Sequence, residues 1–221
     1  MMTTCTSLTR AVGKGAPTLL CLGAHPDDIE IGCGGTVLRI CREHPGTTVH
    51  WVVLGAHGPR EEEALAGARR FRNEAAAGET MVKGFRDGFF PYAGAELKEL
   101  FEGLKGLGSP DLVFTHHRFD RHQDHRVVSD LTWNTWRDHV ILEYEVPKWD
   151  GDLGVPNAFV PLSRAGAEEK AEAIVATFPS QGSKPWFTAD TFLGLMRLRG
   201  NECRAPDGFA EAFHARKLVL F

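Results

Sequence analysis

Residues 18–36 of this chain read TLLCLGAHPDDIEIGCGGT, and this stretch decides the fold. Its first six residues, Thr18–Gly23, form a short apolar run that is typical of a buried strand. Polar residues from His25 to Asp28 follow at once, and a glycine-rich segment then leads into a predicted helix over Gly34–Glu43. A buried strand that passes through a polar turn into a helix favours an α/β fold.

Strands and helices continue to alternate along the rest of the chain. The other predicted strands are Thr48–Leu54, Met81–Phe85, Asp111–Thr115, Val140–Val146 and Asn157–Leu162. The other predicted helices are Glu61–Glu79, Glu96–Leu107, Val127–Arg137, Ala165–Thr177 and Thr188–Leu198, and the chain closes on the apolar run Lys217–Phe221. This alternation favours a mostly parallel sheet with helices on both faces. The sequence contains no repeat or linker-like segment, so we expect one domain.

Composition narrows the class of protein. The 221 residues, 43% hydrophobic and 24% charged, suffice for one substantial core. A net charge of −4 argues against nucleic acid as a partner. Because no segment resembles a secretion signal or a membrane span, we expect a soluble, cytoplasmic protein. Five cysteines, an odd number without a Cys-x-x-Cys pair, predict reduced thiols rather than disulfides or a thiolate zinc site.

A first group of candidate functional residues follows the first predicted strand. Ligands of open α/β sheets bind beyond the carboxyl ends of the strands, so chemistry is expected there. His25 and Asp28 are three residues apart, and on one helical turn their side chains point the same way and could share a metal ion, with Asp27 facing elsewhere. The alternative is that Pro26–Asp28 only caps the next helix, because aspartate is a favoured N-cap residue.

Glycines dominate the segment after this group. The spacing of Gly32, Gly34 and Gly35 matches neither a phosphate-binding loop nor a dinucleotide fingerprint. We therefore expect these glycines to let the helix backbone approach the sheet or a ligand closely.

A second group lies a hundred residues further on. Four of the ten histidines fall within residues 116–125, directly after the predicted strand Asp111–Thr115. Histidine is the commonest metal-ligand side chain and the usual acid or base near neutral pH. We expect His117 to be merely solvated, whereas His122 and His125, three apart at a helix entrance, are expected to be functional.

The two groups together form a coherent site. His25, Asp28 and His125 supply two imidazoles and a carboxylate, the ligand count of a catalytic zinc that keeps a position for water. Asp27 and His122 are left as acid–base groups, which favours a hydrolase over a structural metal site. Two alternatives stay open: an iron enzyme, since the same ligand set holds ferrous iron in oxygenases, and a non-catalytic sugar-binding protein with a retained metal pocket.

The sequence resembles the PIG-L family, also called LmbE-like de-N-acetylases. The resemblance rests on Ala-His-Pro-Asp-Asp followed by Gly-Cys-Gly-Gly-Thr and on His122-Gln123-Asp124-His125, which matches the family's His-x-Asp-His, and it covers residues 17–130. It implies a Rossmann-like three-layer sandwich forming one domain over residues 1–221. It also implies removal of an N-acetyl group from an amino sugar, such as N-acetylglucosamine, or from a metabolite that contains one.

The resemblance also implies a role for each residue of the site. The expected metal ligands are His25, Asp28 and His125, holding Zn²⁺, or else Fe²⁺ or another divalent ion. Asp27 would be the general base, a protonated His122 would stabilise the oxyanion or protonate the leaving amine, and Asp124 would orient a histidine.

Substrate contacts are expected from the loop after the second strand. His57 and Arg60 lie in this loop and are the candidates, although an exposed loop arginine is usually only solvated. The expected partner is a small N-acetylated sugar, and the chain could form a homo-oligomer.

Overall fold

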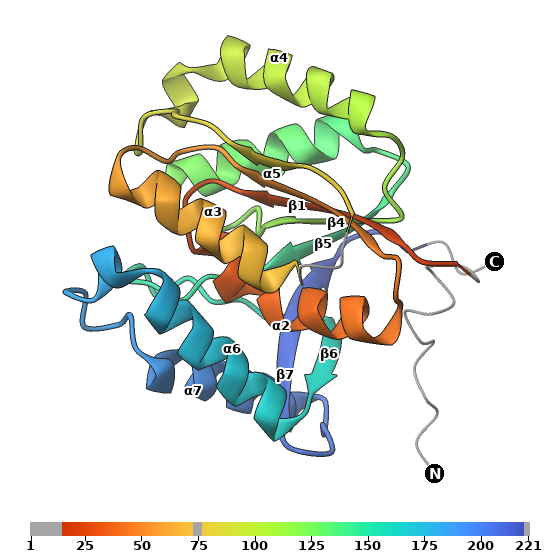
Figure 1. The fold of residues 1–221 in the computed structure, drawn as a ribbon, viewed down its shortest axis with the longest axis vertical. Helices are drawn as coiled ribbons and strands as arrows, with labels where there is room; N and C mark the ends of the chain where they lie inside the picture. Colours follow the sequence, from red (N-terminus) through yellow and green to blue (C-terminus); the bar gives the residue numbers. More distant parts are fainter. Residues whose placement is uncertain (1–14, 73–76, 219–221) are drawn as a thin grey trace.

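A seven-stranded sheet forms the centre of the computed structural model, which describes residues 15–72 and 77–218 (Figure 1). The strands are β1 (Thr18–Gly23), β2 (Thr48–Val53), β3 (Thr80–Val82), β4 (Leu112–His116), β5 (Val140–Tyr144), β6 (Ala158–Leu162) and β7 (Phe209–Ala215). Their order in the sheet is β3-β2-β1-β4-β5-β7-β6. β1 to β5 pair in parallel, whereas β7 is antiparallel to both β5 and β6. The expectation of a mostly parallel α/β sheet is confirmed.

Helices cover both faces of the sheet and make it a three-layer sandwich (Figure 1). They are α2 (Asp28–Glu43), α3 (Pro59–Phe71), α4 (Gly94–Leu104), α5 (Gln123–Thr135), α6 (Arg164–Thr177) and α7 (Ala189–Glu202), with short 3-10 turns η1 (Phe90–Tyr92), η2 (Lys105–Leu107) and η3 (Pro179–Gln181). α2, α3, α6 and α7 pack on one face, and α4 and α5 on the other. None of these helices combines the length and hydrophobicity needed to cross a bilayer.

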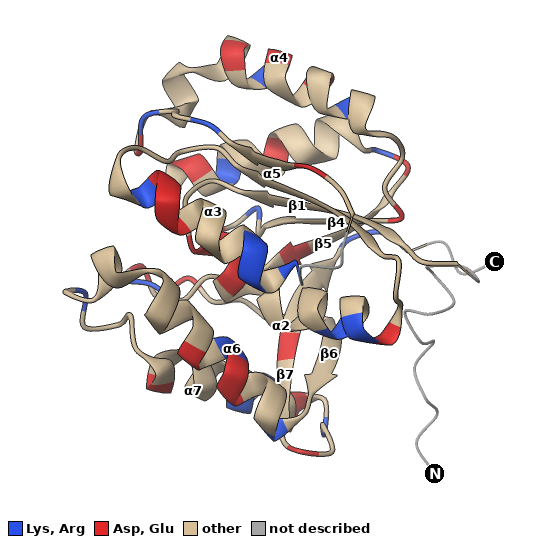
Figure 2. Ribbon diagram, in the orientation of Figure 1, with Lys and Arg blue, Asp and Glu red and all other residues tan. Residues whose placement is uncertain are grey.

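The side chains of β1 point alternately to the two faces of the sheet, and each face has its own hydrophobic core. Leu19 and Cys21 belong to the core under α2, α3, α6 and α7, while Leu20 and Leu22 belong to the core under α4 and α5. Successive side chains of a strand point to opposite faces, so a continuous apolar run serves both layers. Acidic and basic residues are interspersed along the outer helices, in keeping with the small net charge (Figure 2).

Several predicted boundaries were wrong. α2 begins at Asp28 rather than Gly34, so Asp28 lies in its first turn. α3 ends at Phe71, well before Glu79, because the chain has returned to the sheet by Ala77, which bridges to Thr48. Residues 219–221 of the closing apolar run lie outside the described residues. Cys5 does as well, and the four cysteines that the structure describes are free thiols.

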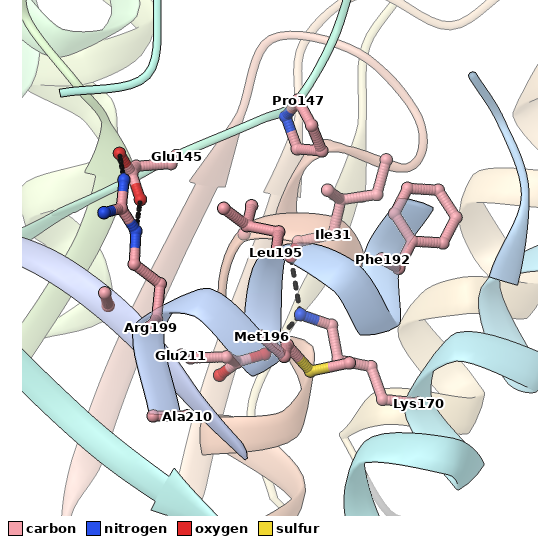
Figure 3. A pocket seen from close by; sticks show the side chains of 12 residues that line it. Ile31, Glu145, Pro147, Lys170, Phe192, Leu195, Met196, Arg199, Ala210 and Glu211 are labelled. Atoms are coloured by element: carbon pink, nitrogen blue, oxygen red, sulfur yellow. Dashed lines mark hydrogen bonds and ion pairs between the residues drawn. The ribbon is translucent and has the colours of Figure 1, made fainter. Parts of the chain in front are cut away.

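β7 is a strand that the sequence did not predict. It reads FAEAFHA, and its first five residues are buried, including the charged Glu211. A buried glutamate breaks the apolar pattern by which a central strand is found. The charge of the buried Glu211 is compensated by Lys170 of α6, whose Nζ lies 2.5 Å from Oε1 of Glu211. Figure 3 shows the two side chains together.

The Lys170–Glu211 pair also forms hydrogen bonds with the backbone in the middle of α2. Glu211 accepts hydrogen bonds from the backbone N–H groups of Gly35, at 2.8 Å, and Thr36, at 2.6 Å. Lys170 Nζ donates to the carbonyl oxygen of Ile31 at 2.6 Å. The last third of the chain, for which the sequence predicted no role, therefore holds the helix that begins with Asp28.

Glycines let α2 pack closely on its neighbours: Gly32 against β5 of the sheet, as expected, and Gly34 against α3. A Cβ added to Gly32 would lie 2.2 Å from Cδ2 of Tyr144, and one added to Gly34 would lie 2.6 Å from the ring of Phe71. Tyr144 cannot move away easily, because its hydroxyl donates to the carbonyl oxygen of Leu22 at 2.7 Å. These glycines serve close packing, not phosphate binding.

We predict that Gly32→Ala lowers the free energy of unfolding by about 1–3 kcal/mol, because the added methyl group overpacks the contact with Tyr144. Gly194→Ala on α7 is the matched control, since a Cβ there meets nothing within 4 Å. We expect this control to be unchanged or about 0.4–1 kcal/mol more stable. Urea unfolding of the three proteins measures both effects, and equal stability of Gly32→Ala and the wild type would refute the contact.

Candidate active site

The pairing of β1 with β4 brings the two groups of polar residues together. The strands are parallel neighbours, with Leu19 opposite Leu112 and Cys21 opposite Phe114. Both therefore end at the same edge of the sheet, where residues 24–28 leave β1 and residues 117–125 leave β4. His25 and His125, one hundred positions apart, meet there.

The three expected metal ligands are in mutual contact. His125 Nε2 lies 3.3 Å from His25 Nδ1 and 3.5 Å from an oxygen of Asp28. His25 Nδ1 lies 3.5 Å from the other oxygen of Asp28. The side chains of His125 and Asp28 are almost fully buried, while that of His25 is 12% exposed. Imidazole nitrogens and carboxylate oxygens are the donors that zinc takes, so the residues fit a divalent cation.

Neighbouring side chains extend this cluster of donors. Three sets of described residues place one ligand atom each within 4.8 Å of one another: His25, His122 and His125; His25, Asp87, His122 and Asp124; and Asp28, His116 and His125. His116 was not predicted. Its Nε2 is 3.3 Å from Asp28 but accepts the backbone N–H of Ala24 at 2.9 Å, so that lone pair is already engaged.

A carboxylate contacts the second ring nitrogen of both His25 and His125. Asp124 lies 3.1 Å from His25 Nε2, as expected for a residue that orients a histidine, and it also accepts the N–H groups of Gly88 and Phe90. Asp120 lies 2.9 Å from His125 Nδ1 and was not predicted. Carboxylates that hold the second ring nitrogen are typical of metal-binding histidines.

Two of the three expected ligands, Asp28 and His125, have the ionisation state that binds a cation, whereas the environment of His25 favours a proton on its ring. Burial opposes ionisation of Asp28, but His125 and His116 outweigh it and hold its pKa well below the usual range. Burial, with His116 beside it, lowers the pKa of His125 to about 4, so its ring is neutral near pH 7. Burial also works against a proton on His25, yet its hydrogen bonds to Asp124 and Asp28 raise its pKa. His125 is therefore neutral and Asp28 ionised, as metal ligands must be, whereas His25 has to give up its proton when a metal binds.

Asp27 has a strained backbone and a side chain that caps nothing. It occupies the N-cap position of α2 with φ 89°, and its side chain makes no cap hydrogen bond. This left-handed conformation costs a non-glycine residue about 1–2 kcal/mol and tends to occur at functional sites. Asp28, not Asp27, accepts the N–H of His25, at 2.6 Å. The helix-capping alternative therefore does not explain the Asp27 side chain.

The Asp27 carboxylate is buried beside a guanidinium group. Asp27 is 6% exposed, and Arg60 Nη2 lies 3.4 Å from its carboxylate. Burial raises the pKa of Asp27 to about 7, while Arg60 acts in the opposite direction. Arg60 also donates to the carbonyl oxygen of Pro26 at 2.6 Å and to Ser180 Oγ at 3.2 Å. Arg60 is thus a partner of Asp27, and its role as a substrate contact stays a prediction.

His57 lies apart from this group among the described residues. Its side chain is exposed and lies against Gly84, where an added Cβ would be 2.9 Å from the ring. The structure does not test its predicted contact with substrate.

His122 is in the site, but its expected protonation does not fit. It is the N-cap of α5, and its Nδ1 accepts the N–H of Asp124 at 3.3 Å. An accepting nitrogen carries no proton, so the ring is the neutral tautomer with its proton on Nε2. Burial, and then the charge of His25, lower the pKa of His122 as well. The ring lies edge-on to His25, with the two centroids 4.9 Å apart.

The expectation that His117 is merely solvated was wrong. It is 8% exposed, and its Nδ1 lies 2.9 Å from Glu143 on β5. Glu143 also accepts from Arg118 and from the indole N–H of Trp133. His117 is therefore part of a buried polar network beside the site.

Comparison with known proteins connects this site to a family. The family model described as PIG-L, GlcNAc-PI de-N-acetylase, matches residues 20–136, more than half of the chain and both groups of site residues. The chain is also 28% identical over 141 residues to the uncharacterized deacetylase YaiS of Escherichia coli (strain K12), which covers 58% of this chain and 74% of YaiS.

Solved structures share the fold over nearly the whole chain. One is the N,N′-diacetylchitobiose deacetylase from Pyrococcus horikoshii, with a TM-score of 0.67 and 21% identity over 91% of this chain and 84% of that one. Another is the 4-carboxy-2-hydroxymuconate hydratase GalB from Pseudomonas putida KT2440, with a TM-score of 0.67 and 15% identity over 93% of this chain and 98% of that one. At such identities the likeness establishes the fold and leaves the chemistry to the site.

We predict that Asp124→Asn lowers the free energy of unfolding of the metal-free protein by about 1–3 kcal/mol at pH 6, because the anion that holds His25 and two backbone N–H groups is lost. Burial opposes its ionisation, but these partners lower the pKa of Asp124. The pKa of Asp124 is thus lower in the folded protein than in the unfolded chain, where it is about 3.9. Ionised Asp124 therefore stabilises the fold at pH values above about 3.9, and this stabilisation is lost as the pH falls through the pKa of the folded state.

The difference between wild type and Asp124→Asn should therefore be largest near pH 6 and shrink below about pH 4. Denaturant unfolding at a series of pH values, with chelator present, measures it. Asp130→Asn, at an exposed position of α5, serves as the control. If the stability difference between wild type and Asp124→Asn grew as the pH was lowered, Asp124 would not be an ionised partner of His25 in the folded protein.

Proposed function

This chain belongs to the PIG-L family, and from that premise we propose that it is a zinc-dependent N-deacetylase acting on an amino sugar or an amino-sugar-containing metabolite. The observation that carries the proposal is the buried, strained Asp27, whose side chain makes no helix-cap hydrogen bond and adjoins a set of metal donors. The names of the relatives support the class of reaction, and the Pyrococcus enzyme is named for an acetylated amino-sugar substrate.

In this proposal His25, Asp28 and His125 hold the cation. A divalent metal bound there would supply Lewis-acid polarisation of the amide carbonyl and would acidify water towards a pKa of about 7. Asp124 and Asp120 fix the two imidazole rings by accepting hydrogen bonds from His25 Nε2 and His125 Nδ1, which would leave the other nitrogen of each ring for the cation. The cation would be zinc, since two imidazoles and a carboxylate make up a known catalytic zinc set.

Asp27 is the general base of the proposed reaction. Its carboxylate takes a proton from water as the water oxygen forms a bond to the amide carbon. When the carbon–nitrogen bond breaks, the same carboxyl group returns a proton to the departing amine, so acetate and a free amine result and Asp27 is regenerated. Arg60 holds the carboxylate in place at 3.4 Å.

His122 stabilises the oxygen that becomes negative. With Nδ1 engaged by the N–H of Asp124, its Nε2–H is left as a donor. A fixed donor in a partly buried site lowers the energy of the transition state without needing a full positive charge on the ring. This replaces the protonated His122 expected from the sequence.

We expect Asp27→Asn to lower kcat by about 10²–10⁴-fold, because an amide cannot accept the proton. The bound zinc per chain should be unchanged, which separates a lost base from a lost metal site. The assay measures acetate and free amine released from a panel of N-acetylated sugars, nucleotide sugars and thiol-glycoside precursors. Asp138→Asn, whose side chain is 91% exposed, is the control. Near-normal turnover with metal bound would remove Asp27 from this role.

Removal of the metal should abolish acetate release, and added zinc should restore it. His125→Ala should bind far less than one zinc per chain and release no acetate, because a buried ligand is lost. Metal analysis of the purified protein also tests the iron alternative. Chelator-resistant acetate release would contradict metal dependence, and a zinc form that binds N-acetyl sugars without releasing acetate would indicate a binding protein.

A further inference from the structure

A buried lysine lies behind the metal-ligand cluster and has no part in the proposed reaction. Lys148, in the segment after β5, has a side chain only 8% exposed. Its Nζ lies 2.9 Å from Asp120 Oδ2 and 2.8 Å from Asp152 Oδ2. Asp152 in turn accepts the N–H of Arg121 at 2.7 Å, so the segment after β5 is attached to the loop that precedes α5.

Asp120 is the point at which this attachment reaches the site. Its Oδ2 contacts both Lys148 and His125 Nδ1, the latter at 2.9 Å, while its Oδ1 accepts the N–H of His122 at 2.8 Å. The carboxylate is 4% exposed and has a donor on each oxygen. A carboxylate held in this way cannot rotate without breaking several buried hydrogen bonds, each of which is costly to leave unmade.

We propose that Asp120 and Lys148 are positioning residues of the metal site. Asp120 accepts the Nδ1 proton of His125, which leaves the Nε2 lone pair free for a metal and fixes the plane of the ring. Lys148 keeps Asp120 in that orientation. The inference rests on the proposed function only in taking His125 as a metal ligand.

Two roles of Lys148 predict opposite changes in metal affinity. If its positive charge alone mattered, its removal would tighten the binding of a nearby dication, because a repulsion would disappear. If it positions Asp120, its removal frees the carboxylate to turn away, and binding weakens. Loss of an outer hydrogen-bonding partner of a metal ligand typically weakens metal binding 10–100-fold.

The experiment measures zinc affinity by competition with a chromophoric chelator, in the absence of substrate, for wild type and four variants. We expect Lys148→Met to bind zinc about tenfold more weakly and Asp120→Asn to bind about 10–100-fold more weakly. Lys148→Arg, which keeps a charged donor for Asp120, should recover part of the loss. Lys98→Met, on the surface of α4, is the matched control and should bind as wild type does.

A second measurement addresses folding and geometry. The absorption spectrum of the cobalt-substituted proteins reports the ligand field, so Lys148→Met should shift its bands while far-UV circular dichroism stays native. If Lys148→Met fails to fold, the nearly isosteric Asp120→Asn supplies the same two readouts. A natively folded Lys148→Met with unchanged or tighter zinc binding would overturn the proposal, as would an unchanged cobalt spectrum.

Failure of this inference is distinguishable from failure of the proposed function. Wild type that binds zinc and releases acetate, together with Lys148→Met that binds zinc equally well, removes only the positioning role. Wild type that binds zinc without releasing acetate from any substrate, together with weakened binding in Lys148→Met, removes only the deacetylase and supports the positioning role.

Discussion

The parallel pairing of β1 with β4 is the constraint on which the rest of the site depends. Neither His25 nor His125 could reach the other unless the two strands ended side by side at one edge of the sheet. Parallel neighbours cannot be joined by a tight turn, and here the connection between them runs through α2, β2, α3, β3 and α4, with β2 and β3 forming the part of the sheet beyond β1. The fold thus uses almost a hundred residues to place two polar turns in contact.

Packing then fixes the turn after β1. The backbone of α2 approaches Tyr144 through Gly32, and the Lys170–Glu211 pair holds the middle of the helix by hydrogen bonds to its backbone. With the helix held in this way, the strained Asp27 at its start cannot relax without moving a well-packed element. The last third of the chain therefore contributes to the site by holding α2, although it supplies none of the expected ligands.

Hydrogen bonds among buried polar groups hold the rings of His25 and His125 in place. Asp124 and Asp120 each hold a histidine and also accept backbone N–H groups, so the loops after β3 and β4 are anchored by the residues that orient the rings. Lys148 adds the segment after β5 to the same network. The loops after β3, β4 and β5 are therefore all connected by hydrogen bonds to the cluster of expected metal ligands.

Residue pattern and spacing predicted the α/β class and most of the strands and helices, and together with the family resemblance they named six residues between His25 and His125 that the structure brings to one edge of the sheet. Apolar periodicity and residues three apart on one turn are local properties, and a sequence displays local properties directly. Features that depend on contacts between distant segments were seen only in the folded protein: β7 with its buried Glu211, Asp120 and Lys148 behind His125, and Arg60 beside Asp27. A charged residue looks the same in a sequence whether it is solvated or buried against a partner of opposite charge. The physical reason is that burial and pairing arise only when the sheet has brought segments a hundred residues apart into contact.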